Sequence, residues 1–231
     1  MRHAGPAFVA LAVVVTAVTS YFAFSASASG ASSTVAFWGL AGGPTLVLAA
    51  LAAAWAHREE YLSDWLGPRW GDFSRGLMGA VLLFALSWAF ARFAVPVGSP
   101  RELWLVSLYG QIGDPRVLQR HPSEVAAAVG VIALAEEVLW RGAVTELLAA
   151  KVGSRAAWLW AAGLYALAYA PTAWALRGAA GCNPVLVVAA FAGGLLWGGM
   201  ARAFGRLAPG VLAHALYDWA VIMMFPLWGH V

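Results

Sequence analysis

The sequence predicts an all-α, polytopic membrane protein, a transmembrane helical bundle with about seven membrane helices. Hydrophobic residues make up 62% of the 231 residues and charged residues only 11%, whereas a soluble domain carries about 25% charged residues. The mean hydropathy is +0.74. The apolar runs are continuous over about 20 residues, which fits membrane helices and not the alternating strands of a barrel. We therefore expect a single helical membrane domain.

Most of the apolar runs have recognisable ends. The first run follows Arg2 and is succeeded by a small polar stretch, 25–30, that is also typical of a signal-peptidase site. Its length favours a retained helix, with cleavage as the alternative. Pro96 ends the third run, and Ser123 is a suitable N-cap for the fourth. The predicted helices span residues 6–24, 35–56, 76–95, 125–149, 156–176, 185–204 and 209–226.

Two connections are too polar or too short to cross a membrane. Residues 57–75 combine many charged side chains with Trp65 and Trp70, which indicates a segment at headgroup level. The apolar piece 103–109 is also too short to span. Lys and Arg are more numerous in the loops that share a side with the N-terminus. The positive-inside rule therefore predicts that the N-terminus lies inside and the C-terminus outside.

The composition also excludes several kinds of site. The formal charge of +3 comes from basic residues in short loops and forms no patch suited to nucleic acid. The single cysteine, Cys182, excludes an intrachain disulfide and a cysteine-based metal site. We predict no cofactor. The expected partners are the lipid bilayer and a membrane protein or peptide substrate, and the sequence leaves the oligomeric state open.

The fourth run carries Glu136, Glu137 and Arg141 near its middle. Each charge at bilayer depth costs about 2.5–3.5 kcal/mol on insertion scales, so the cluster indicates a function or a strong structural pairing. Residues four apart share a helix face, which pairs Glu137 with Arg141 and leaves Glu136 pointing elsewhere, with Trp140 beside it. We expect Glu136 to stay free for chemistry as a base. A purely structural charge cluster is the alternative.

Two further pairs have the same four-residue spacing. His214 and Asp218 share one face of the last helix, where the carboxylate can orient the imidazole or both groups can face a substrate. Tyr165 and Tyr169 lie on the fifth helix, where tyrosines commonly pack between helices with the hydroxyl bonded to the backbone. A metal site made of Glu136, His214 and Asp218 is a further alternative. One histidine with two carboxylates resembles no common zinc hydrolase site.

Together these motifs resemble the CPBP family of intramembrane glutamic endopeptidases, which includes CAAX prenyl proteases and bacteriocin-processing or self-immunity proteins of the Abi type. The resemblance covers about residues 123–225. It divides the membrane domain into N-terminal helices and interfacial segments, 1–122, and a CPBP-like catalytic core, 123–231. Three elements carry the resemblance: Glu136-Glu137-x-x-x-Arg141, Tyr165-x-x-x-Tyr169 and His214-x-x-x-Asp218.

The resemblance implies an endopeptidase that cleaves a membrane-inserted or lipidated protein segment near its C-terminus. In the family the first glutamate, here Glu136, and a histidine of the second motif activate a water molecule, and the last pair stabilises the oxyanion. We expect Tyr165 and Trp140 to contact the substrate. The predicted catalytic residues are Glu136, Glu137, Arg141, Tyr169, His214 and Asp218.

The chain departs from the family pattern at Tyr169, where the second motif has histidine. Tyrosine is a poor general base at neutral pH, although its hydroxyl can position water or donate to an oxyanion. Either Tyr169 works with Glu136 in a variant active site, or the chain has lost proteolysis and binds a membrane peptide as a scaffold or immunity protein. We favour the enzyme, placed in the bacterial inner (cytoplasmic) membrane.

Overall fold

The computed structural model describes residues 5–25 and 31–223, except for the side chains of residues 31–35 and 115. Residues 26–30, which hold most of the predicted signal-peptidase site, lie outside this description, as do residues 224–226 of the last predicted helix. The described chain forms helices and no strand, apart from an isolated bridge between Gly178 and Gly181. The prediction of an all-α bundle is confirmed.

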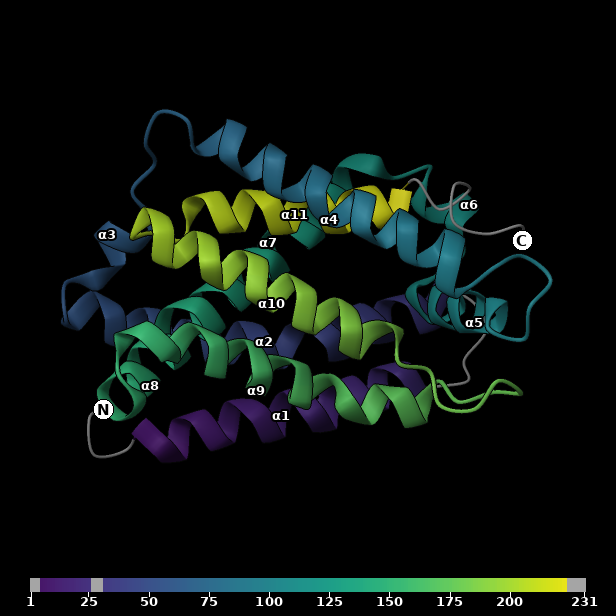
Figure 1. Ribbon diagram of the computed structural model, residues 1–231, viewed down its shortest axis with the longest axis horizontal. Coiled ribbons are helices and arrows are strands. Elements are labelled where there is room, and N and C mark those ends of the chain that lie inside the picture. The colour runs from purple at the N-terminus through teal and green to yellow at the C-terminus, as the bar shows by residue number, and fades with distance from the viewer. Residues whose placement is uncertain (1–4, 26–30, 224–231) are drawn as a thin grey trace.

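Seven long helical segments of the described chain lie side by side and alternate in direction (Figure 1). α1 therefore begins at one end of the bundle and α11 finishes at the other. Each predicted membrane helix coincides with one of these segments. They are α1 (Gly5–Ser25), α2 (Ala31–Arg58), α4 (Asp72–Ala94), the continuous run of α7 (Pro122–Glu136), η1 (Glu137–Val144) and α8 (Thr145–Val152), α9 (Ser154–Ala175), α10 (Val185–Phe204) and α11 (Ala208–Met223).

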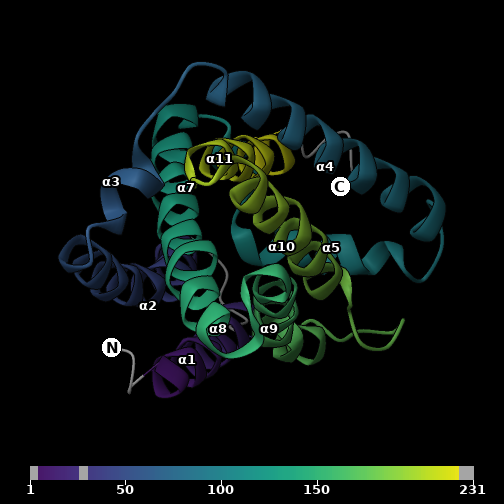
Figure 2. The same ribbon diagram turned by 60° about the vertical axis from the view of Figure 1, so that its left-hand side comes forward.

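By length and composition, 4 helices of the described chain can cross a membrane: α1, Ala36–Arg58 of α2, α4 and α10. The other long segments do not meet this measure. α7 and α11 are 15 and 16 residues long, and the aromatic side chains of α9 lower its hydropathy. Figure 2 shows α1, α2 and α4 at the outside of the bundle. The chain is a multi-pass integral membrane protein, and three of the four helices that can cross a membrane lie at the outside of the bundle.

The end of the bundle near α3 (Tyr61–Leu66) is fixed by two kinds of contact. Trp65 packs against Gly142, where a Cβ atom would lie 2.6 Å from the indole ring, so this close approach requires glycine. The backbone N–H of Leu207 donates to the carbonyl of Trp65 at 2.9 Å. Buried Arg206 donates from Nε to Oδ1 of buried Asp72 at 3.1 Å. These contacts tie α3 and α4 to the turn between α10 and α11.

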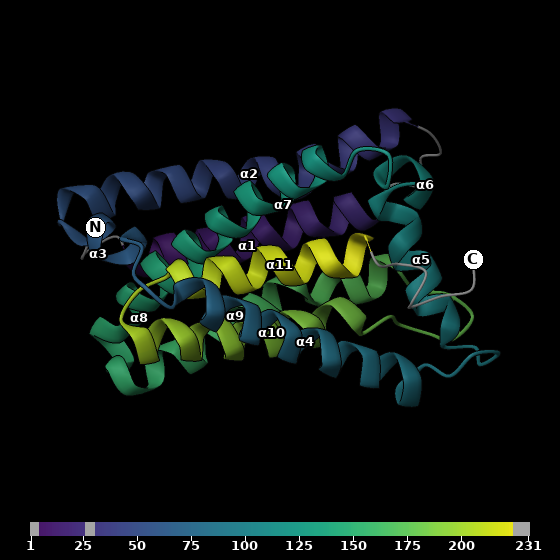
Figure 3. The ribbon, with the colours of Figure 1, turned by 90° about the horizontal axis from the view of Figure 1, so that it is seen from above.

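The opposite end is closed by α5 (Glu102–Ile112) and α6 (Pro115–Leu118), which Figure 3 shows lying across the long helices. The buried side chain of Asn183 donates to the carbonyl of Trp104 at 2.8 Å and accepts from the backbone N–H of Val185 at 3.1 Å. This amide links α5 to the start of α10. The segment that was too short to span thus covers one end of the bundle.

Candidate active site

The helix that carries the two glutamates is not a regular α-helix. α7 ends at Glu136, and the chain continues as the π-helix η1 before α8 begins. Every side chain from 135 to 144 is buried. The Thr145 hydroxyl donates to the carbonyl of Trp140 at 2.9 Å, within this wider turn. The prediction of one regular helix is wrong over η1. Such π-helical turns are rare and frequently lie at functional sites.

Glu137 is the centre of a buried charge cluster. Its Oε1 lies 3.1 Å from Nη1 of Arg141 and 3.0 Å from Nδ1 of His214, and all three side chains are buried. Gly210 permits this approach of α11, because a Cβ atom there would lie 3.2 Å from Oε2 of Glu137. The predicted pair of Glu137 and Arg141 is confirmed, and the structure adds His214 as a second partner.

Glu136 is held by two tyrosine hydroxyls. Tyr165 donates to its Oε2, and Tyr169 donates to its Oε1 at 2.9 Å. The two tyrosines lie one turn apart on α9, so they reach both oxygens of one carboxylate from the same helix. Arg141 pairs with Glu137 and not with Glu136, as expected, but the Glu136 carboxylate is hydrogen-bonded to two tyrosines, which the sequence did not indicate. Tyrosines packed between helices commonly donate to backbone groups. The hydroxyls of Tyr165 and Tyr169 donate to the Glu136 carboxylate instead.

His214 faces Glu136 from α11. Its Nε2 lies 3.7 Å from Oε2 of Glu136 and 3.3 Å from Oδ2 of Asp218. The imidazole also stacks on Trp197, with ring centroids 3.6 Å apart and planes at 16°. The predicted pairing of Asp218 with His214 is confirmed. Because Glu137 contacts Nδ1 on the other edge, three carboxylates and one indole surround the ring.

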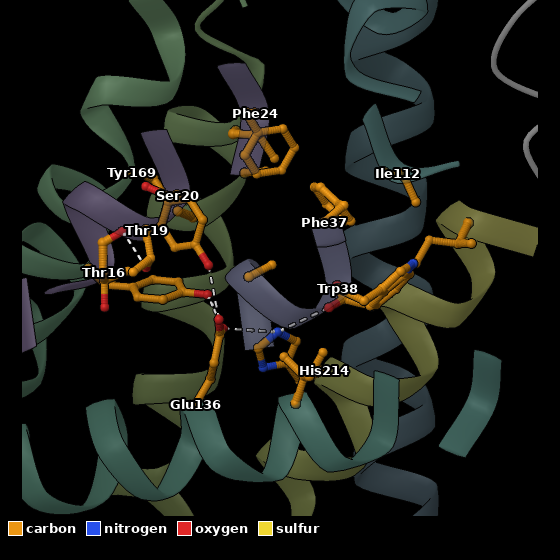
Figure 4. Close-up of a pocket in the computed structure, with 18 of the residues that line it drawn as sticks. Thr16, Thr19, Ser20, Phe24, Phe37, Trp38, Ile112, Glu136, Tyr169 and His214 are labelled. Atoms are coloured by element: carbon orange, nitrogen blue, oxygen red, sulfur yellow. Dashed lines mark hydrogen bonds and ion pairs between the residues drawn. The ribbon is translucent and has the colours of Figure 1, made fainter. Parts of the chain in front are cut away.

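These groups open into a cavity of about 180 Å³ near the middle of the bundle. Figure 4 shows Glu136 between Tyr169 on one side and His214 on the other. The wall also includes residues of α1, α2 and α10, so it draws on helices far apart in the sequence. The predicted site residues in the lining are Glu136, Tyr165, Tyr169, His214 and Asp218.

Three predicted site residues lie behind the described cavity wall. Glu137 supports His214, and the Arg141 guanidinium carbon lies 4.4 Å from the centroid of the Tyr165 ring. Trp140 is 1% exposed and packs edge-on against Tyr165, with centroids 5.2 Å apart. The Trp140 ring lies in the core and outside the described lining, so its contact with substrate stays a prediction. Glu137 and Arg141 contact other predicted site residues and are not part of that lining.

Sequence reasoning missed two residues around the motifs. Trp197 stacks on His214 and lies 5.0 Å from the guanidinium carbon of Arg141. Because tryptophan is abundant in the chain, nothing singled out Trp197. The one sequence feature that could have indicated it is Gly193 one turn earlier, where a Cβ atom would lie 2.6 Å from the Trp197 ring. Thr16 of α1 was also missed, because nothing in the sequence places α1 beside the motifs.

The metal alternative gains no support from this geometry. Within residues 5–25 and 31–223, no group of three or more His, Cys, Asp or Glu side chains is arranged to hold a metal ion. Glu136 and Asp218 both approach Nε2 of His214, yet Glu136 is turned toward the two tyrosines. Among the described residues, the Glu136 carboxylate lies between the imidazole of His214 and the two tyrosine hydroxyls.

Residues 120–220 match a protein-family model described as type II CAAX prenyl endopeptidase Rce1-like. The matched segment begins just before α7 and extends into α11, and it contains Glu136, Tyr169 and His214. The family resemblance drawn from the motifs is confirmed over this range. No curated protein and no solved structure matches the chain. α1 and α2 precede the matched segment, although both contribute to the cavity wall.

Proposed function

We propose that this chain, whose residues 120–220 match the type II CAAX prenyl endopeptidase Rce1-like model, hydrolyses a peptide bond of a membrane-inserted or lipidated protein near its C-terminus. This match supports a membrane-embedded endopeptidase of the CAAX type in general. The finer proposal is that water activated by Glu136 performs the cleavage. The single observation that carries it is a buried carboxylate, Glu136, in a cavity wall opposite the imidazole of His214.

In the proposed reaction Glu136 acts as general base and then as general acid. Its carboxylate takes a proton from water while the hydroxide adds to the carbonyl carbon of the substrate. The protonated Glu136 gives that proton to the amide nitrogen as the C–N bond breaks, which yields a carboxylic acid and an amine. Tyr165 and Tyr169 hold the carboxylate in one orientation throughout, a role that requires hydrogen-bond donors and no basic group.

His214 stabilises the oxyanion in this proposal. The protonated ring donates from both nitrogens, so Nδ1–H can bond to Glu137 while Nε2–H faces the cavity. A donor that is already oriented in a buried site stabilises developing negative charge far better than one in water. Oδ2 of Asp218 lies 3.3 Å from Nε2 and helps to orient this edge of the ring. An ionised Asp218 cannot itself donate to an oxyanion.

A second chamber, next to the active-site cavity, is suited to bind an apolar segment of the substrate. It has a volume of about 290 Å³, lies between α4, α5, α10 and α11, and is lined mainly by apolar side chains. A lipid chain or hydrophobic side chain in this chamber would place the adjoining peptide beside Glu136. Six residues line both the chamber and the cavity: Ile112, Leu186, Ala189, Tyr217, Asp218 and Ile222.

A second candidate function is peptide binding without cleavage. Tyr169 favours it, because the family pattern has histidine there and tyrosine is a poor base at neutral pH. The engagement of both Glu136 oxygens by tyrosines favours it too. In that case the chain captures a membrane peptide as a scaffold or immunity protein. For either function we propose the bacterial inner membrane with the N-terminus inside, in line with the distribution of basic residues.

The proposed function can be tested by determining the C-termini of the other membrane proteins in cells that make this protein. Mass spectrometry of bacterial membranes should find truncated C-termini in cells that make the wild-type protein and none of them in cells that make the Glu136→Gln variant. Glu124→Gln is the matched control, because that carboxylate lies on the same helix and is 67% exposed. It should leave the truncated termini in place. Identical C-termini in wild type and Glu136→Gln would favour the binding role.

A further inference from the structure

α1 presents three hydroxyl side chains to the active-site cavity, those of Thr16, Thr19 and Ser20. Figure 4 shows them on the tyrosine side of Glu136, opposite His214. α1 lies outside residues 120–220, so the family match assigns these residues no role. They raise the question of what α1 contributes to the site.

Two of the three hydroxyls are used within the protein. Thr19 donates to the carbonyl of Val15 at 2.8 Å, the usual bond of a helical threonine to the preceding turn. The Ser20 hydroxyl has two acceptors within reach, the carbonyl of Ala17 in its own helix at 3.2 Å and that of Ala168 on α9 at 3.3 Å. Donation to Ala168 would join α1 to the helix of the two tyrosines. Neither hydroxyl therefore needs a ligand to donate to.

Thr16 differs from both neighbours. Its side chain is buried, with 5% of its surface exposed, and its Oγ1 has no hydrogen-bond partner among the described residues. A buried hydroxyl without a partner is unfavourable and uncommon in native proteins. Oγ1 is itself covered by protein atoms, but the Thr16 side chain lines the cavity. A rotation about χ1 would therefore let this hydroxyl bond to a molecule bound there.

A peptide that is about to be hydrolysed supplies such a partner. At the scissile bond the peptide must be extended, so its N–H and C=O groups lose the internal bonds of a helix. Inside a membrane these groups need replacement partners from the protein. We propose that the Thr16 hydroxyl forms a hydrogen bond with the substrate backbone beside the scissile bond, which makes α1 part of the substrate-binding site. The identity of this ligand rests on the proposed function.

Binding to a non-cleaving protein tests this role. The probe is a fluorescent S-farnesyl-cysteine peptide with three residues after the cysteine, and its Kd is measured by anisotropy in the Glu136→Gln background. Adding Thr16→Val keeps the shape of the side chain and removes its hydroxyl. The loss of one hydrogen bond should weaken binding about three- to tenfold. Adding Thr16→Ser instead, which keeps the hydroxyl, should restore the Kd to within about twofold.

Thr45→Val is the matched control, because Thr45 is a buried threonine whose hydroxyl is bonded to the carbonyl of Ala41 in its own helix, and it is not part of the cavity lining. It should leave the Kd within about twofold of its parent. A second control replaces each amide of the probe near the cysteine by an ester in turn. If Thr16 bonds to one of these groups, the matching ester and Thr16→Val weaken binding less than additively. Equal Kd values for Thr16→Val and its parent, or equal losses for Thr16→Val and Thr45→Val, would overturn the proposal.

The same probe separates this inference from the proposed function. If the wild-type protein fails to cleave the probe while only Thr16→Val weakens binding, proteolysis is wrong and the Thr16 site stands as a peptide-binding site. If the wild-type protein cleaves the probe while Thr16→Val binds it unchanged, the proposed function stands and the role of Thr16 is wrong.

Discussion

Purified protein carrying Glu136→Gln should cleave an S-farnesyl-cysteine peptide about 10²- to 10⁴-fold more slowly than the wild type, the typical contribution of a general base. Glutamine cannot take the proton from water. It has the size of glutamate, and one of the two tyrosine hydroxyls can rotate to accept from its NH2 group while the other still donates to its oxygen, so the fold should persist. Because the proton transfer occurs in the transition state, kcat and kcat/KM should fall together.

The control for this result is Glu124→Gln, which changes an exposed carboxylate on the same helix. It should cleave the peptide at the wild-type rate. The helical content and thermal unfolding of both variants should match the wild type, which separates lost chemistry from lost structure. Cleavage by Glu136→Gln within about threefold of the wild type would remove Glu136 from the reaction, because a general base contributes far more than that.

The Glu137→Gln variant should lose about 3–5 kcal/mol of unfolding free energy, the cost of removing one partner of a buried ion pair. Glu137 is completely buried, and its Oε1 serves both Arg141 and His214. Without the carboxylate, the Arg141 guanidinium keeps a buried charge and loses its ionic partner at 3.1 Å. Equilibrium unfolding in detergent measures this change. Cleavage should fall as well, because Nδ1 of His214 loses its anionic partner.

A double variant separates these two effects of Glu137. Glu137→Leu with Arg141→Met removes both charges and replaces them with apolar side chains of similar size, which is often neutral for stability. It should regain most of the lost unfolding free energy while its cleavage stays impaired. An unfolding free energy for Glu137→Gln within about 1 kcal/mol of the wild type, as for an exposed pair, would contradict the buried cluster.

Features that depend on one helix could be predicted from the sequence. Apolar runs fix where a membrane helix begins and ends, and each predicted run coincides with a long helical segment. The pairs Glu137–Arg141 and His214–Asp218 follow from the four-residue spacing alone, because such residues share a helix face. The Glu137–Arg141 pair persists although its backbone is π-helical, since residues four apart still face similar directions there.

Features that depend on the rotation of one helix against another could not be predicted. The hydroxyls of Tyr165 and Tyr169 reach Glu136 only because α9 turns that face toward α7. The same four-residue spacing would also allow both tyrosines to bond to backbone groups. The placement of Thr16 in the cavity likewise depends on how α1 packs against α9, which leaves no local pattern in the sequence.

A comparison of purified wild-type protein with the Tyr169→His variant, on the same peptide, shows most directly whether two tyrosines can hold Glu136 for catalysis. If they can, the wild-type protein should cleave the peptide with no substitution. The Tyr169→His substitution should then change the rate of a cleavage reaction that the wild-type protein already performs. A wild-type protein no faster than Glu136→Gln, together with cleavage by Tyr169→His, would contradict the account and identify a lapsed enzyme that binds peptides.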